Sequence, residues 1–266
     1  MRSVHQKNID EGAAIDWGHT AADYARYRPG PPESFFARLV ASGVGKPGQR
    51  ILDLATGTGV LAREFARRGC EVTGVDVAQG QVAMAKQMAT SEGLTARWIV
   101  TEAEATGLAD RSFDVITAQQ CWMYFDPRAI LRECARLLVP GGLLMIGHAS
   151  FLPRKDAVVA ASEALVLRHN PAWQGVDWDG VVEANPDLAS PLGRLESFFA
   201  YEEGVAFTAE SWRGRMRALR GIGASLDAAA VAAFDKEHAE LLARIAPPSF
   251  SVLHGFDAHV FRFEAR

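Results

Sequence analysis

Between residues 50 and 150, short apolar runs alternate with segments whose apolar residues recur at helical spacing. An apolar run bounded by turn signals predicts a buried strand, and repeats three and four residues apart predict an amphipathic helix. Five strands are expected, with helices between most of them, at 50–54, 71–75, 96–100, 113–118 and 143–147. This repetition predicts a doubly wound α/β fold with a mostly parallel sheet covered by helices on both faces.

The pattern changes after residue 150, where longer helical segments and two alternating segments follow one another. The expected elements are helices at 156–168, 208–220 and 226–245, strands at 195–207 and 251–263, and a loop at 170–191. No internal repeat or low-complexity linker separates this half from the first. We therefore expect a single domain over residues 1–266, with helical insertions in the C-terminal half of the chain.

Composition and charge exclude several classes of protein. A chain that is 48% apolar and 23% charged can bury a core and is not disordered. The longest apolar stretch, 137–147, is broken by Pro140 and is shorter than the roughly 18 residues of a membrane span. Residues 1–20 lack the apolar core of a signal peptide. A net charge of −4 provides no general field for nucleic acid or anionic lipid, so neither is an expected partner.

The three cysteines and seven histidines match no zinc-binding spacing, so no metal is expected. An odd number of cysteines without a disulfide pattern favours a reducing, cytoplasmic compartment. The cysteines are Cys70, Cys121 and Cys134.

Residues 51–61 carry the strongest indication of a ligand, because a buried strand there meets Gly57 and Gly59 and then a helix. Glycines allow close approach to the backbone, and a helix N-terminus offers N–H groups and partial positive charge to a carboxylate or phosphate. Asp76 ends the next strand, 17 residues after Gly59, a spacing typical of a carboxylate that binds ribose hydroxyls. The two features predict an adenosine-containing ligand. The simpler interpretation is a tight turn, with Asp76 capping the next helix.

Two classes of adenosine ligand fit this turn. Residues 57–62 satisfy the G-x-G-x-x-G/A pattern, so an NAD-dependent oxidoreductase is one hypothesis. One observation argues against an NAD site: Asp53 lies inside the strand, where dinucleotide-binding folds usually carry an apolar residue. The loop also begins early, at Ala55, and an acidic Glu102-Ala103-Glu104 segment follows the third strand.

Further motifs occur in order along the chain: D-x-A-x-G-x-G at 53–59, Val75-Asp76, Glu102-Ala103-Glu104, S-F-D-V at 112–115 and L-x-P-G-G at 138–142. Together they resemble the class I S-adenosylmethionine (SAM) methyltransferases of the ubiquinone/menaquinone methyltransferase-like group, over roughly residues 20–150. The resemblance implies a Rossmann-like sheet of seven strands with a final antiparallel strand, expected at 251–263. It also implies methyl transfer from SAM to N, O, S or C of a small-molecule acceptor by in-line displacement. A non-catalytic SAM-binding protein is a third hypothesis, because such a displacement needs no conspicuous base.

The resemblance implies a role for each matching position. The backbone of 55–59 would hold the methionine end of SAM, Asp53 would order that loop, and Asp76 would bind the ribose. Val77 and the Glu102-Ala103 pair would contact adenine, and Gln119 would lie beside the sulfonium. The expected cofactor-binding residues are Tyr27, Arg28, Asp53, Ala55, Thr56, Gly57, Gly59, Asp76, Val77, Glu102, Ala103 and Gln119.

Two of these positions depart from the family pattern. Ala55 stands where the first glycine is usual, and its methyl group is tolerable only at negative φ. Glu102 replaces the more usual Asp and adds one methylene of reach. We expect SAM binding to survive both changes.

The segment 17–29 resembles the lid of the family. The expected domain therefore has three parts: a lid at 1–35, a SAM-binding core at 36–150, and the rest of the sheet with substrate-covering insertions at 151–266. Tyr24 and Tyr27 fall on one helical face and would cover SAM, with Arg28 near its carboxylate. The alternative is an aromatic face packed on the core.

The acceptor is expected above the fourth and fifth strands. His148 is the candidate base, because imidazole titrates near neutral pH, although a histidine satisfied at a strand end is an equal alternative. Arg213, which shares a helix face with Arg217 and Arg220, would bind an anion or belong to a solvated face. The other candidates for substrate contact are Tyr24, Trp122, Tyr124 and Trp173, the last of which could instead anchor its loop.

Overall fold

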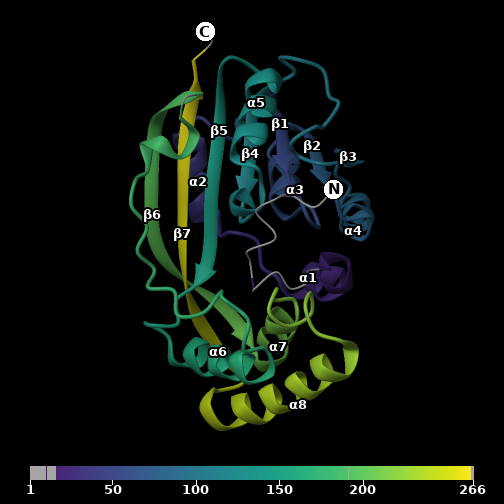
Figure 1. Ribbon diagram of the computed structural model, residues 1–266, viewed down its shortest axis with the longest axis vertical. Helices are drawn as coiled ribbons and strands as arrows, with labels where there is room; N and C mark the ends of the chain where they lie inside the picture. The colour runs from purple at the N-terminus through teal and green to yellow at the C-terminus, as the bar shows by residue number, and fades with distance from the viewer. Residues whose placement is uncertain (1–9, 11–15, 191, 265–266) are drawn as a thin grey trace.

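The computed structural model describes residue 10, residues 16–190 and residues 192–264. In these residues seven strands form one sheet in the order β3-β2-β1-β4-β5-β7-β6 (Figure 1). The strands are β1 (Arg50–Leu54), β2 (Glu71–Asp76), β3 (Arg97–Val100), β4 (Phe113–Gln119), β5 (Leu138–Phe151), β6 (Gly193–Thr208) and β7 (Ser249–Phe263). The first five pair in parallel, and β7 is antiparallel to both of its neighbours, β5 and β6. The predicted fold class and its antiparallel last strand are confirmed.

Helices connect most of the strands, and the last four α-helices begin at a residue whose side chain caps the helix. They are α1 (Ala21–Tyr27), α2 (Glu33–Ala41), α3 (Val60–Arg67), α4 (Gln79–Ser91), α5 (Pro127–Leu137), α6 (Ala157–His169), α7 (Ala209–Arg217) and α8 (Ala228–Ile245), with 3-10 helices η2 (Trp17–Thr20), η3 (Trp122–Tyr124) and η4 (Pro186–Ala189). Asp126 accepts a hydrogen bond from the Ala129 N–H, and Pro127 is the first residue of α5. Such a cap stabilises a helix by about 1 kcal/mol. No helix among the described residues is both long enough and apolar enough to span a bilayer.

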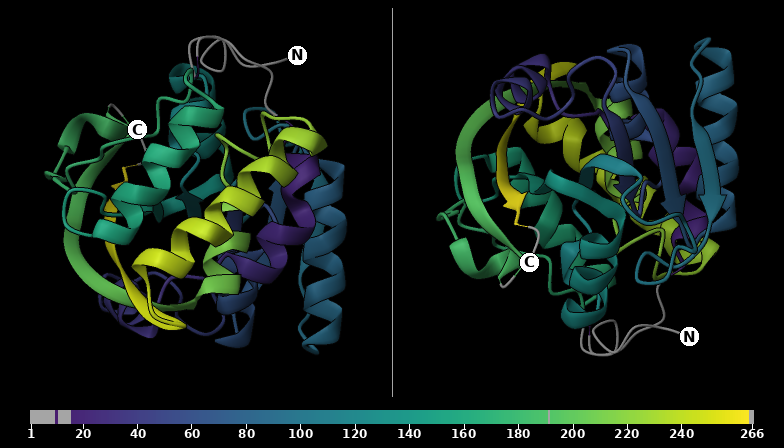
Figure 2. Two further views of the ribbon diagram at one scale, coloured as in Figure 1. Left: turned by 90° about the horizontal axis from the view of Figure 1, so that it is seen from below. Right: turned by 90° about the horizontal axis from the view of Figure 1, so that it is seen from above.

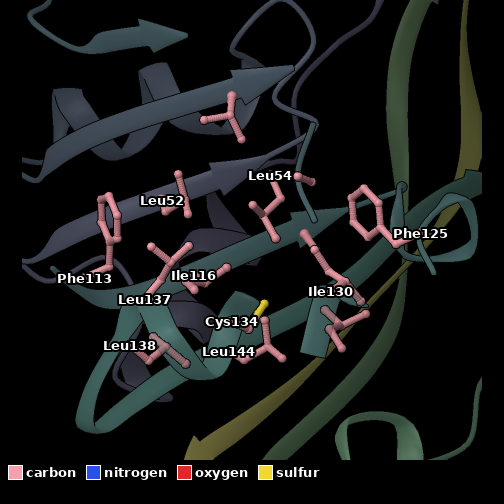
Figure 3. Close-up of a cluster of buried hydrophobic side chains, with 14 of the residues drawn as sticks. Leu52, Leu54, Phe113, Ile116, Phe125, Ile130, Cys134, Leu137, Leu138 and Leu144 are labelled. Atoms are coloured by element: carbon pink, nitrogen blue, oxygen red, sulfur yellow. The ribbon is translucent and has the colours of Figure 1, made fainter. Parts of the chain in front are cut away.

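Each face of the sheet has its own core. On one face, Ile130, Cys134 and Leu137 of α5 pack against Leu52, Ile116 and Leu144 of the central strands (Figure 3). On the other face, α2 and α3 contribute Phe35, Phe36 and Phe65 in edge-to-face contacts. Both faces of the central strands are therefore buried, which leaves the strand ends as the place where side chains can meet a ligand.

A third core joins the insertions at the carboxyl ends of the parallel strands. Helices α6, α7 and α8 gather there, beside α1, as the views along the sheet show (Figure 2). The buried Trp212 of α7 donates a hydrogen bond to Ser162 Oγ, which lies 3.0 Å from Nε2 of His238 on α8. These insertions cover the edge at which ligands bind in parallel sheets.

The expected strands and helices were found, most of them with ends that differ by one or two residues, and the expected loop 170–191 contains η4; two elements differ more. The predicted strand 143–147 is the longer β5, because its ladder with β7 continues to the pair Phe151 and His254. The helix predicted at 208–220 ends at Arg217, since the chain turns through residues 218–226 with Gly223 N–H bonded to the Arg217 carbonyl.

Candidate active site

The turn between β1 and α3 is built around two glycines in left-handed conformation. Gly57 has φ +57° and Gly59 has φ +73°, a region that glycine adopts without steric cost. A Cβ on Gly59 would lie 2.6 Å from the Trp98 ring, whereas a Cβ on Gly57 would meet nothing closer than 3.9 Å. Gly59 is therefore required by close packing, and Gly57 leaves its side of the turn open.

Asp53 organises this turn from inside β1. Its carboxylate accepts hydrogen bonds of 2.6 Å from Thr56 Oγ1 and from Thr117 Oγ1 of β4. Burial raises the pKa of Asp53 to about 6, and the two hydroxyl donors oppose that rise. The carboxyl thus joins the turn to the end of β4, the ordering role expected for it.

Asp76 joins the end of β2 to the same turn. Its Oδ2 accepts a hydrogen bond of 2.8 Å from the Gly57 N–H, and its Oδ1 accepts one of 2.8 Å from the Ala78 N–H at the start of α4. Burial raises the pKa of Asp76, and these N–H donors oppose the rise. Each carboxylate oxygen has a second lone pair, so the helix-capping interpretation and a ribose contact are compatible.

A cavity of about 700 Å³, including its open mouth, lies beside this turn. Its floor is the end of β1 and the turn, from Asp53 to Thr56, and its walls include Gln119 of β4 and Ala149 of β5. The segment 28–31, together with α7, β6 and β7, closes the other side. The lining combines backbone of the glycine turn, apolar side chains and a few polar groups, as small-molecule sites commonly do.

Gln119 is a polar residue of the cavity lining whose side-chain amide has no partner within the described part of the protein. Neither its amide nitrogen nor its amide oxygen has a hydrogen-bond partner among the described residues, although both atoms are buried. An unpaired buried amide costs about 1–3 kcal/mol, so polar ligand atoms that pair with it would bind favourably.

The sequence of the chain is similar to known methyltransferases. A family model described as "Methyltransferase domain" matches residues 52–146. The ubiquinone biosynthesis O-methyltransferase of Cereibacter sphaeroides is 32% identical over 179 residues, which are 66% of this chain and 71% of the relative. The protein of that name from Xanthomonas campestris pv. campestris is 30% identical over 223 residues, 81% of this chain and 89% of the relative. The chain belongs to the class I SAM-dependent methyltransferases.

Solved structures of low sequence identity share the methyltransferase fold. Haemonchus contortus phosphoethanolamine N-methyltransferase 2, in complex with phosphomonomethylethanolamine and S-adenosylhomocysteine, superposes with a TM-score of 0.54 at 20% identity. That match covers 97% of this chain and 58% of the other. The YcgJ protein from Bacillus subtilis matches with a TM-score of 0.51 at 20% identity, over 88% of this chain and 100% of the other.

The cofactor of this methyltransferase is SAM, and the residues of the turn and cavity fit it. Gly57 leaves room for close approach, the helix start supplies N–H groups, and the Gln119 amide lacks a partner in the protein. Arg28 lines the cavity with its guanidinium over the Tyr24 ring, 4.6 Å from the ring centroid. A zwitterionic ligand with a carboxylate is compatible with this donor set.

Ala55 corrects the expectation about the first loop position. Its φ is +47°, so the chain accommodates the methyl group in a left-handed conformation and not at negative φ. This conformation costs a non-glycine residue roughly 1–2 kcal/mol. The hydrogen bonds of the turn, including the Thr56 N–H to the Val75 carbonyl, hold the backbone in this geometry.

The two lid tyrosines do not share one task. Tyr24 lines the cavity, and its expected role of covering SAM stays a prediction. Tyr27 packs its ring on Gly214 of α7 and donates from its hydroxyl to Glu210 Oε1 at 3.0 Å, so its ring contacts α7 and is not part of the cavity lining. Its expected contact with the cofactor stays a prediction. Helical spacing put both rings on one face, but α7 lies against part of that face. Residues 1–9 and 11–15 of the predicted lid lie outside the described residues.

The expected adenine contacts lie outside the cavity lining. Val77 is 62% exposed, and Glu102 is also exposed, while Ala103 is buried in the core beneath. β2 and β3 are adjacent, with Asp76 opposite Val100, so the three residues follow neighbouring strand ends. Their roles toward adenine remain predictions.

His148 and the residues after β4 are not brought to this cavity. His148 Nδ1 lies 3.2 Å from Oδ1 of the buried Asp257, whereas the next residue, Ala149, lines the cavity. Trp122 packs beside Phe125, and the Tyr124 hydroxyl accepts a hydrogen bond of 3.0 Å from Arg220. Successive strand residues face opposite sides, which explains the separation of His148 from Ala149.

The expected substrate contacts in the insertions have structural partners. Trp173 is buried against Gly221, so it anchors its loop. Arg213 pairs with Asp235 of α8, and Arg217 pairs with both Asp235 and Asp23 of α1. The predicted arginine face therefore joins helices, and neither the anion-binding nor the solvated interpretation describes it.

Several residues that line the cavity were not predicted from the sequence, among them Arg215, His254 and Phe256. Arg215 lies in the arginine-rich helix but off the face that was considered. His254 and Phe256 are on β7, far along the chain from every motif, and no local pattern marks them.

Proposed function

We propose that this enzyme methylates an N, O, S or C atom of a small-molecule acceptor bound in the cavity between α7 and the ends of β1 and β4. The observation that carries the proposal is the continuity of the cavity from the glycine turn to Gln119, an amide without a partner in the described residues. The names of the curated relatives, ubiquinone biosynthesis O-methyltransferases, support a small organic acceptor.

Each residue of the site has a proposed task. SAM supplies a methyl group on a sulfonium, a leaving group good enough for direct displacement. The backbone of 55–59 and Arg28 bind the methionine end, Asp76 accepts from the ribose hydroxyls, and Val77 with Glu102 and Ala103 borders adenine. Gln119 fixes the reacting end, and the surrounding apolar walls exclude water. His148 is retained as a proposed base only for an acceptor that reaches past Ala149.

The proposal extends to the number of domains, the cellular compartment and the class of substrate. We infer one domain over 1–266, because β6 and β7 of the C-terminal half complete the sheet of the first half. Cys70, Cys121 and Cys134 are all free and buried, which supports a reducing cytoplasm. The net charge of −4 supports a small molecule rather than nucleic acid as substrate.

The experiment is turnover of methyl-labelled SAM with a fractionated metabolite extract, followed as formation of S-adenosylhomocysteine. We expect label transfer to a compound of low mass, which mass spectrometry then identifies together with the methylated atom. Absence of turnover with every fraction, despite SAM binding, would support the non-catalytic alternative. Tight NAD binding without SAM binding would support an oxidoreductase.

A further inference from the structure

Arg215 is a charged group buried in the wall of the cavity. It lies on α7, is 7% exposed, and borders the same space as Arg28 and His254. Its guanidinium lies over the Phe151 ring, 5.3 Å from the centroid. Burying a guanidinium is costly unless an anion accompanies it.

The other arginines of this segment show what Arg215 lacks. Arg213 and Arg217 form ion pairs with Asp235, and Nε of Arg220 lies 2.7 Å from Oδ2 of Asp10. Among the residues that the structure describes, no carboxylate forms an ion pair with Arg215, and the ionisable groups that act on its charge are Arg28 and Tyr24. Burial, reinforced by the charge of Arg28, lowers the pKa of Arg215 to about 9, so its charge is retained at neutral pH but disfavoured.

The cavity has more positive charge than SAM can neutralise. Arg28 is a second guanidinium there without a carboxylate partner in the described part of the chain. The one acidic residue of the lining is Asp53, whose carboxyl is held by Thr56 and Thr117. SAM brings one carboxylate, together with an ammonium and a sulfonium. After that carboxylate pairs with one guanidinium, a second anion is needed for the other.

The surroundings of Arg215 favour a single negative charge. His254 Nδ1 lies 2.9 Å from the Val252 carbonyl oxygen, which can only accept, so Nδ1 carries the hydrogen and Nε2 is an acceptor. Burial lowers the pKa of His254 to about 4, so this ring is neutral at pH 7 and adds no cation. Phe151 and Phe256 complete an apolar environment.

We propose that Arg215 binds a carboxylate of the methyl acceptor, so that the substrates of this enzyme are organic acids with an apolar body. The inference rests on the proposed function and specifies its substrate class. Arg215 is a specificity-determining residue in this account, because a neutral acceptor leaves its buried charge without a partner.

The test measures binding of benzoate to the complex of the protein with S-adenosylhomocysteine, using ligand-observed NMR, with benzamide as the neutral match. We expect benzoate to bind at least tenfold more tightly than benzamide, and Arg215→Gln to abolish that preference. Arg215→Lys should keep part of it, because the charge remains but the planar fork does not. Arg244→Gln removes an exposed arginine of α8 and should leave the preference unchanged.

Three outcomes would overturn the proposal. Benzoate and benzamide could bind the wild-type complex equally, Arg215→Gln could retain the preference, or phenyl phosphate could bind tenfold more tightly than benzoate and so identify a phosphate site. Because wild-type protein supplies the first and third comparisons, poor folding of one variant does not prevent a decision.

Cofactor binding separates this proposal from the one on which it rests. We expect Arg28→Gln to lower affinity for S-adenosylhomocysteine at least fivefold but not affinity for 5′-methylthioadenosine, which lacks the carboxylate. Arg215→Gln should lower neither. If Arg215→Gln lowers the affinity for S-adenosylhomocysteine but not the affinity for 5′-methylthioadenosine, Arg215 binds the carboxylate of the cofactor. That result would refute the proposed site for the carboxylate of the acceptor. If wild-type protein does not bind S-adenosylhomocysteine, the proposed function itself fails.

Discussion

Ala55 adopts a backbone conformation in the turn that lowers the stability of the fold. Its φ of +47° is favourable for glycine and costs alanine roughly 1–2 kcal/mol. We predict that Ala55→Gly raises the free energy of unfolding by about 1 kcal/mol, after the greater chain entropy of unfolded glycine is counted. Urea unfolding checks this value. A loss of stability would mean that the methyl group makes contacts worth more than the strain.

Asp53 makes a pH-dependent contribution whose sign follows from its raised pKa. The unfolded carboxyl ionises near pH 3.8, but the folded one remains protonated up to about pH 6. The unfolded state therefore loses its proton first, and this carboxyl destabilises the fold progressively as pH rises from about 4 to 6. Below this window both states are protonated and the effect vanishes.

Asp53→Asn removes that titration while keeping the shape of the side chain. We predict that the stability of this variant relative to wild type increases between pH 4 and pH 7, by an amount on the order of 2–3 kcal/mol. Denaturant unfolding of both proteins at the two pH values measures it. A pH-independent difference would contradict the raised pKa.

At the scale of elements, the lid position depends on the packing of α1 against α7. Arg217 on α7 holds Asp23 with two hydrogen bonds of 2.8 and 2.9 Å, and Tyr27 packs directly on Gly214. A Cβ at residue 214 would lie 2.0 Å from the Tyr27 ring. The absence of a side chain there is what allows α1 to approach and to bring Tyr24 and Arg28 to the cavity.

We predict that Gly214→Ala weakens binding of S-adenosylhomocysteine about tenfold by displacing α1. Alanine favours a helix over glycine by about 1 kcal/mol, so α7 itself is not destabilised. Adding Tyr27→Ala should restore part of the affinity, because it removes the ring that clashes. Calorimetric titration of the two single variants and the double variant gives the coupling. Additive effects would show that the Gly214–Tyr27 contact does not position the lid.

At the scale of the whole molecule, the sheet could be predicted from the sequence, but the full set of residues that line the cavity could not. Strands and glycine turns have local signals, such as the apolar run 51–54 before Gly57, because periodicity and positive φ restrict the residue types. The cavity lining instead brings together Gln119, Arg215 and His254, whose proximity depends on how β7 and α7 pack. Spacing along the chain carries no information about such contacts.

The arginines of α7 show why a helix face alone is a poor guide to function. Helical spacing separated Arg213 and Arg217 from Arg215 correctly, yet which face meets the cavity depends on α8. Asp235 and Asp23 engage the first two residues, and that leaves Arg215 on the cavity side. Partners on other elements, invisible to local pattern, decide the role of each charge.

Calorimetric titration of SAM into wild-type protein, Asp76→Ala and the exposed control Asp179→Ala tests directly whether the turn and Asp76 bind the cofactor. We expect one SAM site in wild type, an affinity in Asp76→Ala lower by about 1–3 kcal/mol as the ribose contacts are lost, and no change in the control. Wild-type protein that binds no SAM, or an Asp76→Ala variant with undiminished affinity, would contradict this expectation.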